Sequence, residues 1–427
     1  MSASEARGVS IEDELEEIGA VRAAAELREQ PIDPPAQQAR GLRSLVIMHL
    51  PEVSGPSRSL ETEMEWLAAQ GEMDVLVPSI GPGRLPDEFR HFADVHAADY
   101  STLTVPNGPA DAVSVGYRFR RSYRLFRKHI RRTGADLVLV TSALLPAALL
   151  AARTENARAI LYAGEILDTP RVPSGSRSFV GHKLLEFAAR STSGVVACSD
   201  RVGRQYVERG AQNVTTISPP IGSRYTRGEA ARFRVEHEIP SGAPLIISVG
   251  SITQGRAQDV LIRALPSIRR QVPDAHLAII GDPHPRDVDR AYALEIQRLA
   301  ALLVPGGITF CGFRERVEDA YAAASVVVNP SRYEGFGRVA FEAAVAGRPV
   351  VSTSAGAIPE VLRDGADALL VPPDRPGDLA AAVLRLLHDA ELGSRLANSG
   401  GSRARAEMST SGSLAAFQAT VEQSLCA

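Results

Sequence analysis

Cysteine is scarce in this chain of 427 residues. Its three cysteines, Cys198, Cys311 and Cys426, form an odd, sparse set, which excludes a disulfide framework and favours a reducing cytoplasm. No cysteine and histidine spacing is typical of a zinc site, so no metal is expected. Cys198 and Cys311 lie in apolar, strand-like runs, which favours small core residues over catalytic thiols.

An excess of positive charge is also lacking. The chain has 47 basic and 50 acidic residues, a formal net charge of −3, whereas nucleic-acid-binding chains usually carry a basic excess. Only two of the basic residues are lysines, so 47 − 2 leaves 45 arginines. The balance argues against a nucleic-acid partner.

No apolar run is long enough to span a bilayer. The longest, residues 137–152, is too short and contains Thr141, Ser142 and Pro146. The N-terminus is acidic at residues 12–17 (EDELEE), where a signal peptide needs a cationic start and an apolar run. A cytoplasmic protein is expected, with at most peripheral contact at the inner face of the membrane.

Residues 1–40 differ from the rest of the chain. They carry nine acidic and four basic residues, a net charge of −5, and end in a stretch rich in proline and glutamine. This composition predicts a disordered tail. A short helix near residues 11–28 that docks on a partner is the alternative.

From residue 41 onward, short β-branched runs alternate with helical segments. The runs lie at 44–50, 74–80, 136–142, 158–164, 194–200 and 213–219. Helical crossovers between such strands are typical of a parallel, doubly wound sheet. A break at 219–222 (PPIG) ends this first domain, residues 41–222.

The alternation then restarts in residues 223–405. Apolar runs at 244–251, 276–282, 307–313, 325–331, 349–354 and 368–373 predict a second parallel sheet. A last segment, 406–427, is predicted to be helical over about 411–425 and to return to the first domain. The fold class is α/β with two Rossmann-like domains facing across a cleft, where ligands bind at the carboxyl ends of strands.

The segment with the strongest chemical signal is 329–349 (NPSRYEGFGRVAFEAAVAGRP). Gly335 and Gly337 precede a helix that starts at Arg338, and a helix N-terminus suits a diphosphate. Glu342 lies roughly 6 Å further along the axis, where a carboxylate can accept hydroxyls of an attached ribose. Glu334 would face a sugar on the other side of the phosphates. From spacing alone, a structural role for both residues is equally compatible with the sequence. In that role Glu334 is an acidic residue that favours the helix dipole, and Glu342 is a solvent-exposed helix residue.

The two glutamates, with seven residues between them, resemble the motif of retaining family 4 glycosyltransferases with the GT-B fold. The flanking sequences PSRYEGFG and AGRPVVSTSAGAIPEVLRDGADALLVPP also resemble that family. The resemblance is strong over about 240–405 and weaker, though collinear, over about 41–225. It implies that Glu334 contacts the donor sugar, that Glu342 holds the ribose, and that the backbone of Gly335, Phe336 and Gly337 meets the diphosphate.

Two further loops complete the donor site that the resemblance implies. Gly312 and Phe313 lie in the segment 311–314 that resembles the base-holding loop. Gly250, Ser251 and Arg256 lie in a second phosphate loop, where the family usually has arginine at the place of Ser251 and lysine at that of Arg256. Arg256 retains a cation that can bind phosphate in a bidentate manner, and Arg338 is a candidate to compensate for Ser251.

The acceptor side departs further from the family pattern. Residues 51–58 (PEVSGPSR) follow the first strand as the family's glycine-rich loop does, with Gly55 and Ser57 as candidates to approach the ligands. An ordinary turn with Ser57 or Ser59 as helix N-cap is the alternative. Gly164 stands where many members have a histidine, and Glu165 follows it.

The segment 117–132 (YRFRRSYRLFRKHIRR) carries eight cations between interleaved aromatic residues. A solvated helix face that packs through Tyr123, Phe126 and Ile130 is one interpretation. The other is an interfacial patch for anionic lipid headgroups.

The resemblance implies a retaining hexosyltransferase (EC 2.4) that moves a sugar from a nucleotide-diphosphate donor to a hydroxyl of a glycan, glycolipid or small molecule. It needs neither a metal nor a cofactor beyond the nucleotide sugar, which is a co-substrate. Two alternatives remain open: a non-catalytic nucleotide-sugar-binding partner protein and a GT-B nucleotide-sugar epimerase.

Overall fold

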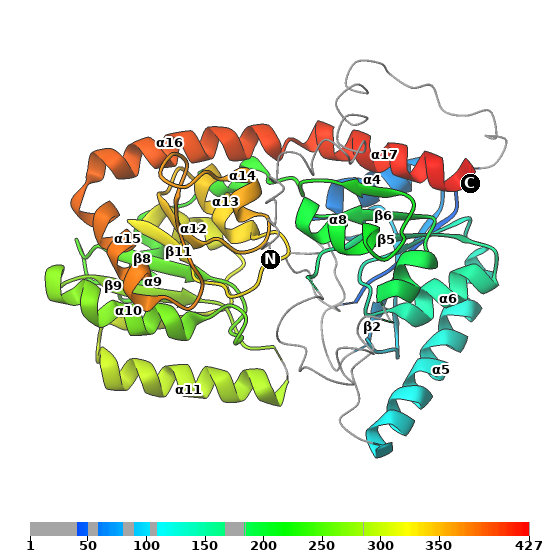
Figure 1. The fold of residues 1–427 in the computed structure, drawn as a ribbon, viewed down its shortest axis with the longest axis horizontal. Coiled ribbons are helices and arrows are strands. Elements are labelled where there is room, and N and C mark those ends of the chain that lie inside the picture. The colour runs from blue at the N-terminus through cyan, green and yellow to red at the C-terminus, as the bar shows by residue number, and fades with distance from the viewer. Residues whose placement is uncertain are drawn as a thin grey trace, which may run out of the picture. The chain divides into compact units, whose positions relative to one another are not determined.

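The computed structural model describes residues 41–49, 59–79, 89–102, 109–166, 183, 185–284 and 286–426. The predicted tail, residues 1–40, lies outside this part of the chain. Figure 1 shows the described elements in sequence colours. None of the described helices is both long and apolar enough to cross a membrane.

The N-terminal domain contains a parallel sheet of seven described strands in the order β3-β2-β1-β4-β5-β6-β7. These strands are β1 (Ser44–Ile47), β2 (Met73–Pro78), β3 (Asp94–Ala98), β4 (Leu137–Val140), β5 (Arg158–Ala163), β6 (Gly194–Ala197) and β7 (Val214–Thr216). Strands β1, β4 and β6 are fully buried because both faces are covered, as is usual for parallel sheets. The strand order reverses between β1 and β4, where α/β folds bind ligands.

Four helices of this domain bear on the later argument. They are α4 (Glu61–Gln70), α5 (Pro109–Thr133), α6 (Pro146–Thr154) and α8 (Asp200–Val207). Leu60, and not Ser59, is the N-cap of α4, so the alternative of Ser59 as N-cap is wrong; Ser57 lies outside the described residues. Ser199 does cap α8, because its hydroxyl oxygen accepts a hydrogen bond from the backbone N–H of Val202.

The C-terminal domain contains a second parallel sheet of six described strands in the order β10-β9-β8-β11-β12-β13. These strands are β8 (Leu245–Val249), β9 (His276–Ile280), β10 (Ile308–Gly312), β11 (Val326–Asn329), β12 (Val350–Thr353) and β13 (Leu369–Val371). The order reverses between β8 and β11, so the loops that follow these two strands lie at the ligand-binding edge.

The connections of this domain alternate with its strands. Before β8 come the short 3-10 turn η2 (Ser223–Thr226) and α9 (Ala230–Glu236); the helices that follow are α10 (Gln258–Gln271), α11 (Asp287–Leu303), α12 (Val317–Ala323), α13 (Arg338–Val345), α14 (Ile358–Val361) and α15 (Pro376–His388). The fold predicted from the alternation of apolar runs and helical segments, two parallel-sheet domains, is confirmed.

Two long helices close the chain, and each packs on a different domain. Helix α16 (Ala390–Glu407) packs on α13, whereas α17 (Thr410–Cys426) packs on β5, β6, β7 and α4. Both are red in Figure 1. The hydroxyl of Ser413 donates to Glu63 over 2.9 Å, and Phe417 meets Trp66 edge to face. The end of the chain therefore belongs to the core of the N-terminal domain.

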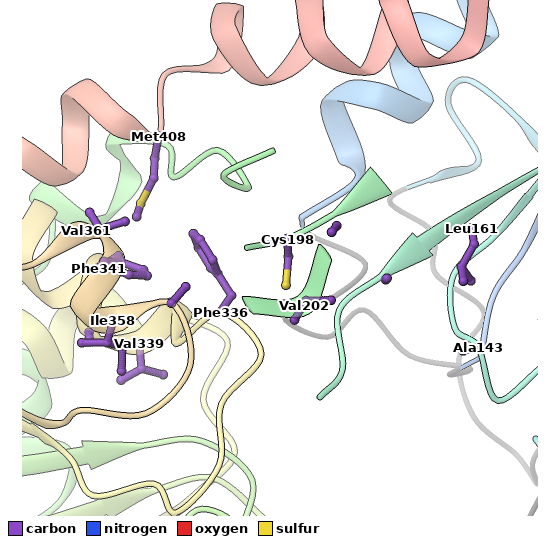
Figure 2. Packing of buried hydrophobic residues seen from close by; sticks show 14 of the residues in the cluster. Ala143, Leu161, Cys198, Val202, Phe336, Val339, Phe341, Ile358, Val361 and Met408 are labelled. Carbon is purple, nitrogen blue, oxygen red and sulfur yellow. The ribbon is translucent and has the colours of Figure 1, made fainter. Parts of the chain in front are cut away.

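One buried apolar cluster contains residues of both domains. Figure 2 shows Phe336 among these residues, with Phe341 and Ile358 from the C-terminal domain and Cys198 and Val202 from the N-terminal one. The Phe336 and Phe341 rings are 4.8 Å apart. Cys198 and Cys311 are both buried, as the sequence predicted, and burial raises the pKa of the Cys311 thiol to about 11.

Candidate active site

The loop between β11 and α13 has a backbone that only glycine allows at two places. Gly337 has a φ of +94°, and a Cβ there would lie 2.5 Å from a side-chain carbon of Ile358. At Gly335, a Cβ would lie 1.9 Å from the carbonyl oxygen of Gly164, in the N-terminal domain. The loop can therefore contact the other domain only because it has glycine at position 335.

Helix α13 starts at Arg338, directly after this loop. The first N–H groups of an α-helix have no partner within the helix, and they carry a partial positive charge. Phe336 is buried at 8% exposure, which fixes the turn that leads into the helix. The predicted helix start at Arg338 is therefore present, and phosphate binding at this helix N-terminus stays a prediction.

Glu334 and Arg256 are in contact. The guanidinium of Arg256 forms an ion pair with Oε1 of Glu334, and Ser331 Oγ lies 2.9 Å from the same oxygen. The carboxylate is buried, with 6% of the side chain exposed, whereas Arg256 is one-third exposed. Glu334, predicted to contact the donor sugar, and Arg256, predicted to bind phosphate, come from separate loops, and the fold brings them together.

The loop that carries Gly250, Ser251 and Arg256 is fixed to the 330–334 segment by a second ion pair. The guanidinium of Arg332 donates to both carboxylate oxygens of Asp259, over 3.0 and 2.9 Å, and the Tyr292 hydroxyl donates to Asp259 over 2.7 Å. Burial works against the charge of Asp259, but the hydrogen bonds from Arg332 and Tyr292 lower the pKa of its carboxyl group. Asp259 is therefore charged and holds the two loops in register.

Gly250, at the end of β8, also needs its lack of a side chain. Its φ of +135° lies in the region that favours glycine. Its carbonyl oxygen would lie 2.2 Å from a Cβ at position 281, so Gly281 must also lack a side chain. The carbonyl of Ser251 accepts a hydrogen bond from the Gln258 amide over 3.0 Å. These contacts place the start of the loop beside the end of β9.

Glu342 has three hydrogen-bond donors among the described residues. The Tyr225 hydroxyl and Arg338 Nε donate to Oε1, each over 2.8 Å, and the Tyr321 hydroxyl donates to Oε2 over 2.9 Å. Glu342 is 7% exposed, so it is not the solvated helix residue that spacing alone allowed. A buried carboxylate needs such donors to remain charged.

Arg338 does not act as a free cation for a phosphate in this structure. Its guanidinium donates to Glu342, to the Ser59 hydroxyl and to the carbonyl of Pro220, the last two over 3.3 Å. Burial opposes its charge, but the Glu342 carboxylate raises the pKa of Arg338 above the usual value. That Arg338 compensates for Ser251 remains a prediction.

Gly312 ends β10, and Phe313 follows it. Gly312 has a φ of +67°, Phe313 is 59% exposed, and its backbone N–H donates to Asp282 over 3.2 Å. A cavity of about 440 Å³ lies against Gly312, Gly281, Asp282 and residues of α11 such as Leu294. The segment that resembles the base-holding loop therefore borders a hollow in the C-terminal domain.

Gly164 and Glu165, predicted on the acceptor side, follow β5, and Gly164 lies at the contact with the C-terminal domain. The Ser199 hydroxyl donates to the carbonyl of Gly335 over 2.9 Å. Oε2 of Glu165 is buried and has no hydrogen-bond partner among the described residues, while the Glu165 carbonyl accepts from Gln205. Gly55 and Ser57 lie outside the described residues.

His49, two residues after the end of β1, was not singled out from the sequence. Its Nδ1 lies 2.9 Å from the Thr141 hydroxyl oxygen, which fixes the ring. Burial lowers the pKa of His49, and the Glu165 carboxylate opposes this effect. The only available signal in the sequence was its place at the end of the first predicted strand. Residues at the carboxyl end of a parallel strand lie at the edge of the sheet where α/β folds bind ligands.

The hydroxyl partners of Glu334 and Glu342 were also missed. No sequence pattern around these partners, Ser331, Tyr225 and Tyr321, indicates a contact with either glutamate. In a single sequence, a buried tyrosine or serine cannot be distinguished from any other core residue. Tyr225 and Tyr321 are separated from Glu342 by 117 and 21 residues.

Parts of this chain are similar in sequence to known proteins. Residues 243–389 match the family model described as "Glycosyl transferases group 1". A D-inositol 3-phosphate glycosyltransferase of Nocardia farcinica is 36% identical over 203 residues, which cover 46% of this chain and 45% of that protein. An uncharacterized glycosyltransferase of Methanocaldococcus jannaschii is 34% identical over 165 residues, 38% of this chain and 40% of that one. In these matches the chain spans less than half the length of its curated relatives.

Solved structures match over most of the chain. Anabaena HepE, in complex with UDP and glucose, has a TM-score of 0.73 and 18% identity and covers 89% of this chain and 99% of its own. Sucrose-phosphate synthase of Thermosynechococcus elongatus has a TM-score of 0.74 and 19% identity, with coverages of 89% and 98%. Residues 243–389 are therefore similar to the group 1 glycosyl transferases, and the chain has the GT-B fold of two parallel-sheet domains.

Proposed function

We propose that the protein is a retaining glycosyltransferase that moves a sugar from a nucleotide-diphosphate donor to an acceptor hydroxyl. The observation that supports it most is the pairing of Glu334 with Arg256 beside the N-terminus of α13, with Glu342 one turn further along that helix. The group 1 match over residues 243–389 and the glycosyltransferase names of the relatives point to the same chemistry.

In this proposal the donor lies along α13. The N–H groups of Gly335, Phe336 and Gly337 bind the diphosphate, Gly312 and Phe313 border the base, and Glu342 accepts a hydrogen bond from the ribose. Glu334 accepts a hydrogen bond from the donor sugar. Arg256 has five N–H donors, so its guanidinium can pair with Glu334 and still offer N–H groups to the diphosphate, with Gly250 and Ser251 lining the same loop.

The transfer needs charge stabilisation and positioning more than a dedicated base. As the glycosidic bond to the donor phosphate breaks, negative charge develops on the leaving diphosphate, where Arg256 and the helix N-terminus stabilise it. The leaving phosphate takes the proton of the acceptor hydroxyl as that oxygen bonds to the same face of the anomeric carbon, so the configuration is retained. In this scheme the diphosphate charge is met without a metal.

The acceptor approaches from the N-terminal domain. The carboxyl end of β5 is followed by Gly164 and Glu165, and that of β1 by Met48 and His49. Gly164 lies in close contact with Gly335. Several relatives are named D-inositol 3-phosphate glycosyltransferases. A cyclitol phosphate is therefore the first acceptor to test, ahead of glycans and glycolipids.

The proposal is tested by binding and by transfer. We expect calorimetry to detect binding of UDP or GDP to the unmodified protein. This nucleotide affinity should fall at least tenfold in Glu342→Ala and change little in Glu334→Ala. We expect transfer to D-inositol 3-phosphate, followed by mass spectrometry, to be largely lost in Glu334→Ala. Failure of UDP, GDP and ADP to bind would refute the proposal, and an epimerised donor in a reaction without acceptor would favour an epimerase.

A peripheral membrane contact is the second part of the proposal, and it rests on helix α5. Four of its cations pair with carboxylates of neighbouring segments: Arg121 with Asp99, Arg127 and Arg131 with Glu155, and Arg132 with Asp74. Arg120, Arg124 and Lys128 have no carboxylate partner among the described residues, and their spacing of four places them along one exposed face.

Two apolar residues continue this face toward the start of the helix. Val113 is 75% exposed and Tyr117 is 68% exposed, one turn apart and one turn before Arg120. Phe126 and Ile130 are buried, so the opposite face packs on the domain. A face that joins unpaired cations to exposed apolar side chains suits an anionic bilayer surface.

A further inference from the structure

The three donors to the Glu342 carboxylate come from three different elements. Tyr225 lies in η2, Tyr321 in α12 and Arg338 at the start of α13. The two tyrosine rings pack edge to face, with centroids 5.9 Å apart, and both are buried. The carboxylate is therefore held from several sides and cannot turn freely about its last bond.

Both tyrosine hydroxyls remain protonated and therefore donate. Burial raises the pKa of Tyr225, and the neighbouring Glu342 carboxylate raises it further; the same two causes raise the pKa of Tyr321. Each phenol consequently directs its hydrogen to the carboxylate. The two phenols thus act as hydrogen-bond donors to Glu342.

Two of the three donors are connected to the segment 217–222, which links the two domains. Tyr225 follows that segment directly. Arg338 donates to the carbonyl of Pro220 in the segment and to Ser59 of the N-terminal domain. The orientation of the Glu342 carboxylate thus depends on contacts outside the domain that would hold the nucleotide.

A count of lone pairs limits what Glu342 can still accept. A carboxylate offers about four acceptor positions. Among the described residues, Tyr225 and Arg338 take two on Oε1 and Tyr321 takes one on Oε2, so these residues leave one position on Oε2 free.

We propose that Tyr225 is a positioning residue for the donor: its hydroxyl fixes Glu342 so that the free position on Oε2 receives one ribose hydroxyl. The inference rests on the proposed function, in which Glu342 meets the ribose. Since the ribose is remote from the bond that breaks, the contact stabilises bound donor and transition state equally. Tyr225 consequently affects donor affinity and not the rate at saturating donor.

The test compares Tyr225→Phe with a matched Tyr100→Phe control. The buried Tyr100 hydroxyl also makes hydrogen bonds, to the carbonyls of Met48 and Leu76 over 2.6 and 2.8 Å, but lies in the N-terminal domain. Calorimetry would measure the Kd of UDP or GDP, whichever binds the unmodified protein, and of its 2′-deoxy and 3′-deoxy forms. Thermal unfolding would show that both variants are folded.

We expect Tyr225→Phe to raise the nucleotide Kd about tenfold and Tyr100→Phe to leave it within about twofold. The reason is that, of these two tyrosines, only Tyr225 orients the Glu342 carboxylate. In the unmodified protein, one of the two deoxy forms should bind about tenfold more weakly and the other should not. In Tyr225→Phe that difference should fall to less than about threefold, because the two changes disrupt the same contact.

Three results would overturn the inference while leaving the proposed function intact. The first is an unchanged nucleotide Kd in Tyr225→Phe. The second is an equal loss of affinity for both deoxy nucleotides in the unmodified protein. The third is that the deoxy nucleotide loses the same factor in affinity in Tyr225→Phe as in the unmodified protein. The second of these needs no variant. If UDP, GDP and ADP all fail to bind the unmodified protein, the proposed function fails and this inference fails with it.

Discussion

The pair formed by Arg256 and Glu334 has two roles that can be separated. One is structural, because Glu334 is a buried carboxylate whose partners are Arg256 and Ser331. The other is the proposed contact of both residues with the donor. Removing only one charge of a buried pair leaves the other without compensation, which costs more than removing both.

We therefore predict that Arg256→Met lowers the free energy of unfolding by about 2 kcal/mol, and that the double variant Arg256→Met/Glu334→Gln recovers most of this loss. Sugar transfer should remain lost in both. Urea denaturation and a transfer assay measure the two effects. Arg385→Met, which removes an exposed arginine of α15, is the control and should leave both unchanged. A double variant as unstable as Arg256→Met would contradict the structural role.

The sequence indicated the residue types of the site but not all of their contacts. Glu334 and Glu342 stand in a recognisable motif within one short segment. Tyr225 is a different case, because only folding brings it 2.8 Å from Glu342. A contact across 117 residues leaves no pattern in a single sequence, and a phenylalanine at 225 would fit the same core.

At the scale of elements, apolar runs identified the strands whose faces are both covered. Strand β3 was missed, because Asp94–Ala98 lies at the sheet edge and has exposed and half-buried residues in place of an apolar run. Helix α5 shows the opposite limit. Its amphipathic pattern predicted the buried Phe126 and Ile130, but only the structure separates its paired cations from its unpaired ones.

This separation gives a prediction for α5. Sedimentation with vesicles of phosphatidylcholine containing about one-third phosphatidylglycerol should show binding that weakens in high salt. The triple variant Arg120→Gln/Arg124→Gln/Lys128→Gln should bind at least about tenfold more weakly, since each cation near an anionic surface contributes about 1 kcal/mol.

The control for this experiment removes the same charge elsewhere. Arg298, Arg385 and Arg395 are exposed on helices of the C-terminal domain, and their triple glutamine variant has the same net charge. It should bind the vesicles as the unmodified protein does. Equal weakening of both triple variants would show that total charge, and not the α5 face, determines binding.

At the scale of the whole molecule, the alternation of strands and helices was sufficient to predict two parallel-sheet domains, because helical crossovers force neighbouring strands to run parallel. What it could not predict is which residues of the two domains touch. The Gly335 carbonyl accepts from Ser199, and the carboxylate of Glu360 in α14 accepts from the backbone N–H groups of Asp200 and Arg201, over 3.1 and 3.0 Å. Thus α14 of one domain caps α8 of the other.

Glu360 therefore reports on the contact between the domains. The first N–H groups of α8 would otherwise lack partners, and loss of a capping side chain costs about 1 kcal/mol. We predict that Glu360→Ala accelerates hydrogen exchange at the amides of Asp200 and Arg201 about fivefold, as followed by mass spectrometry. Asp389→Ala is the matched control, because Asp389 caps α16 within a single domain by accepting from the Leu392 N–H over 2.8 Å. It should accelerate exchange at the start of α16 and leave α8 unchanged. Unchanged exchange at Asp200 and Arg201 in Glu360→Ala would mean that the domains separate from this contact in solution.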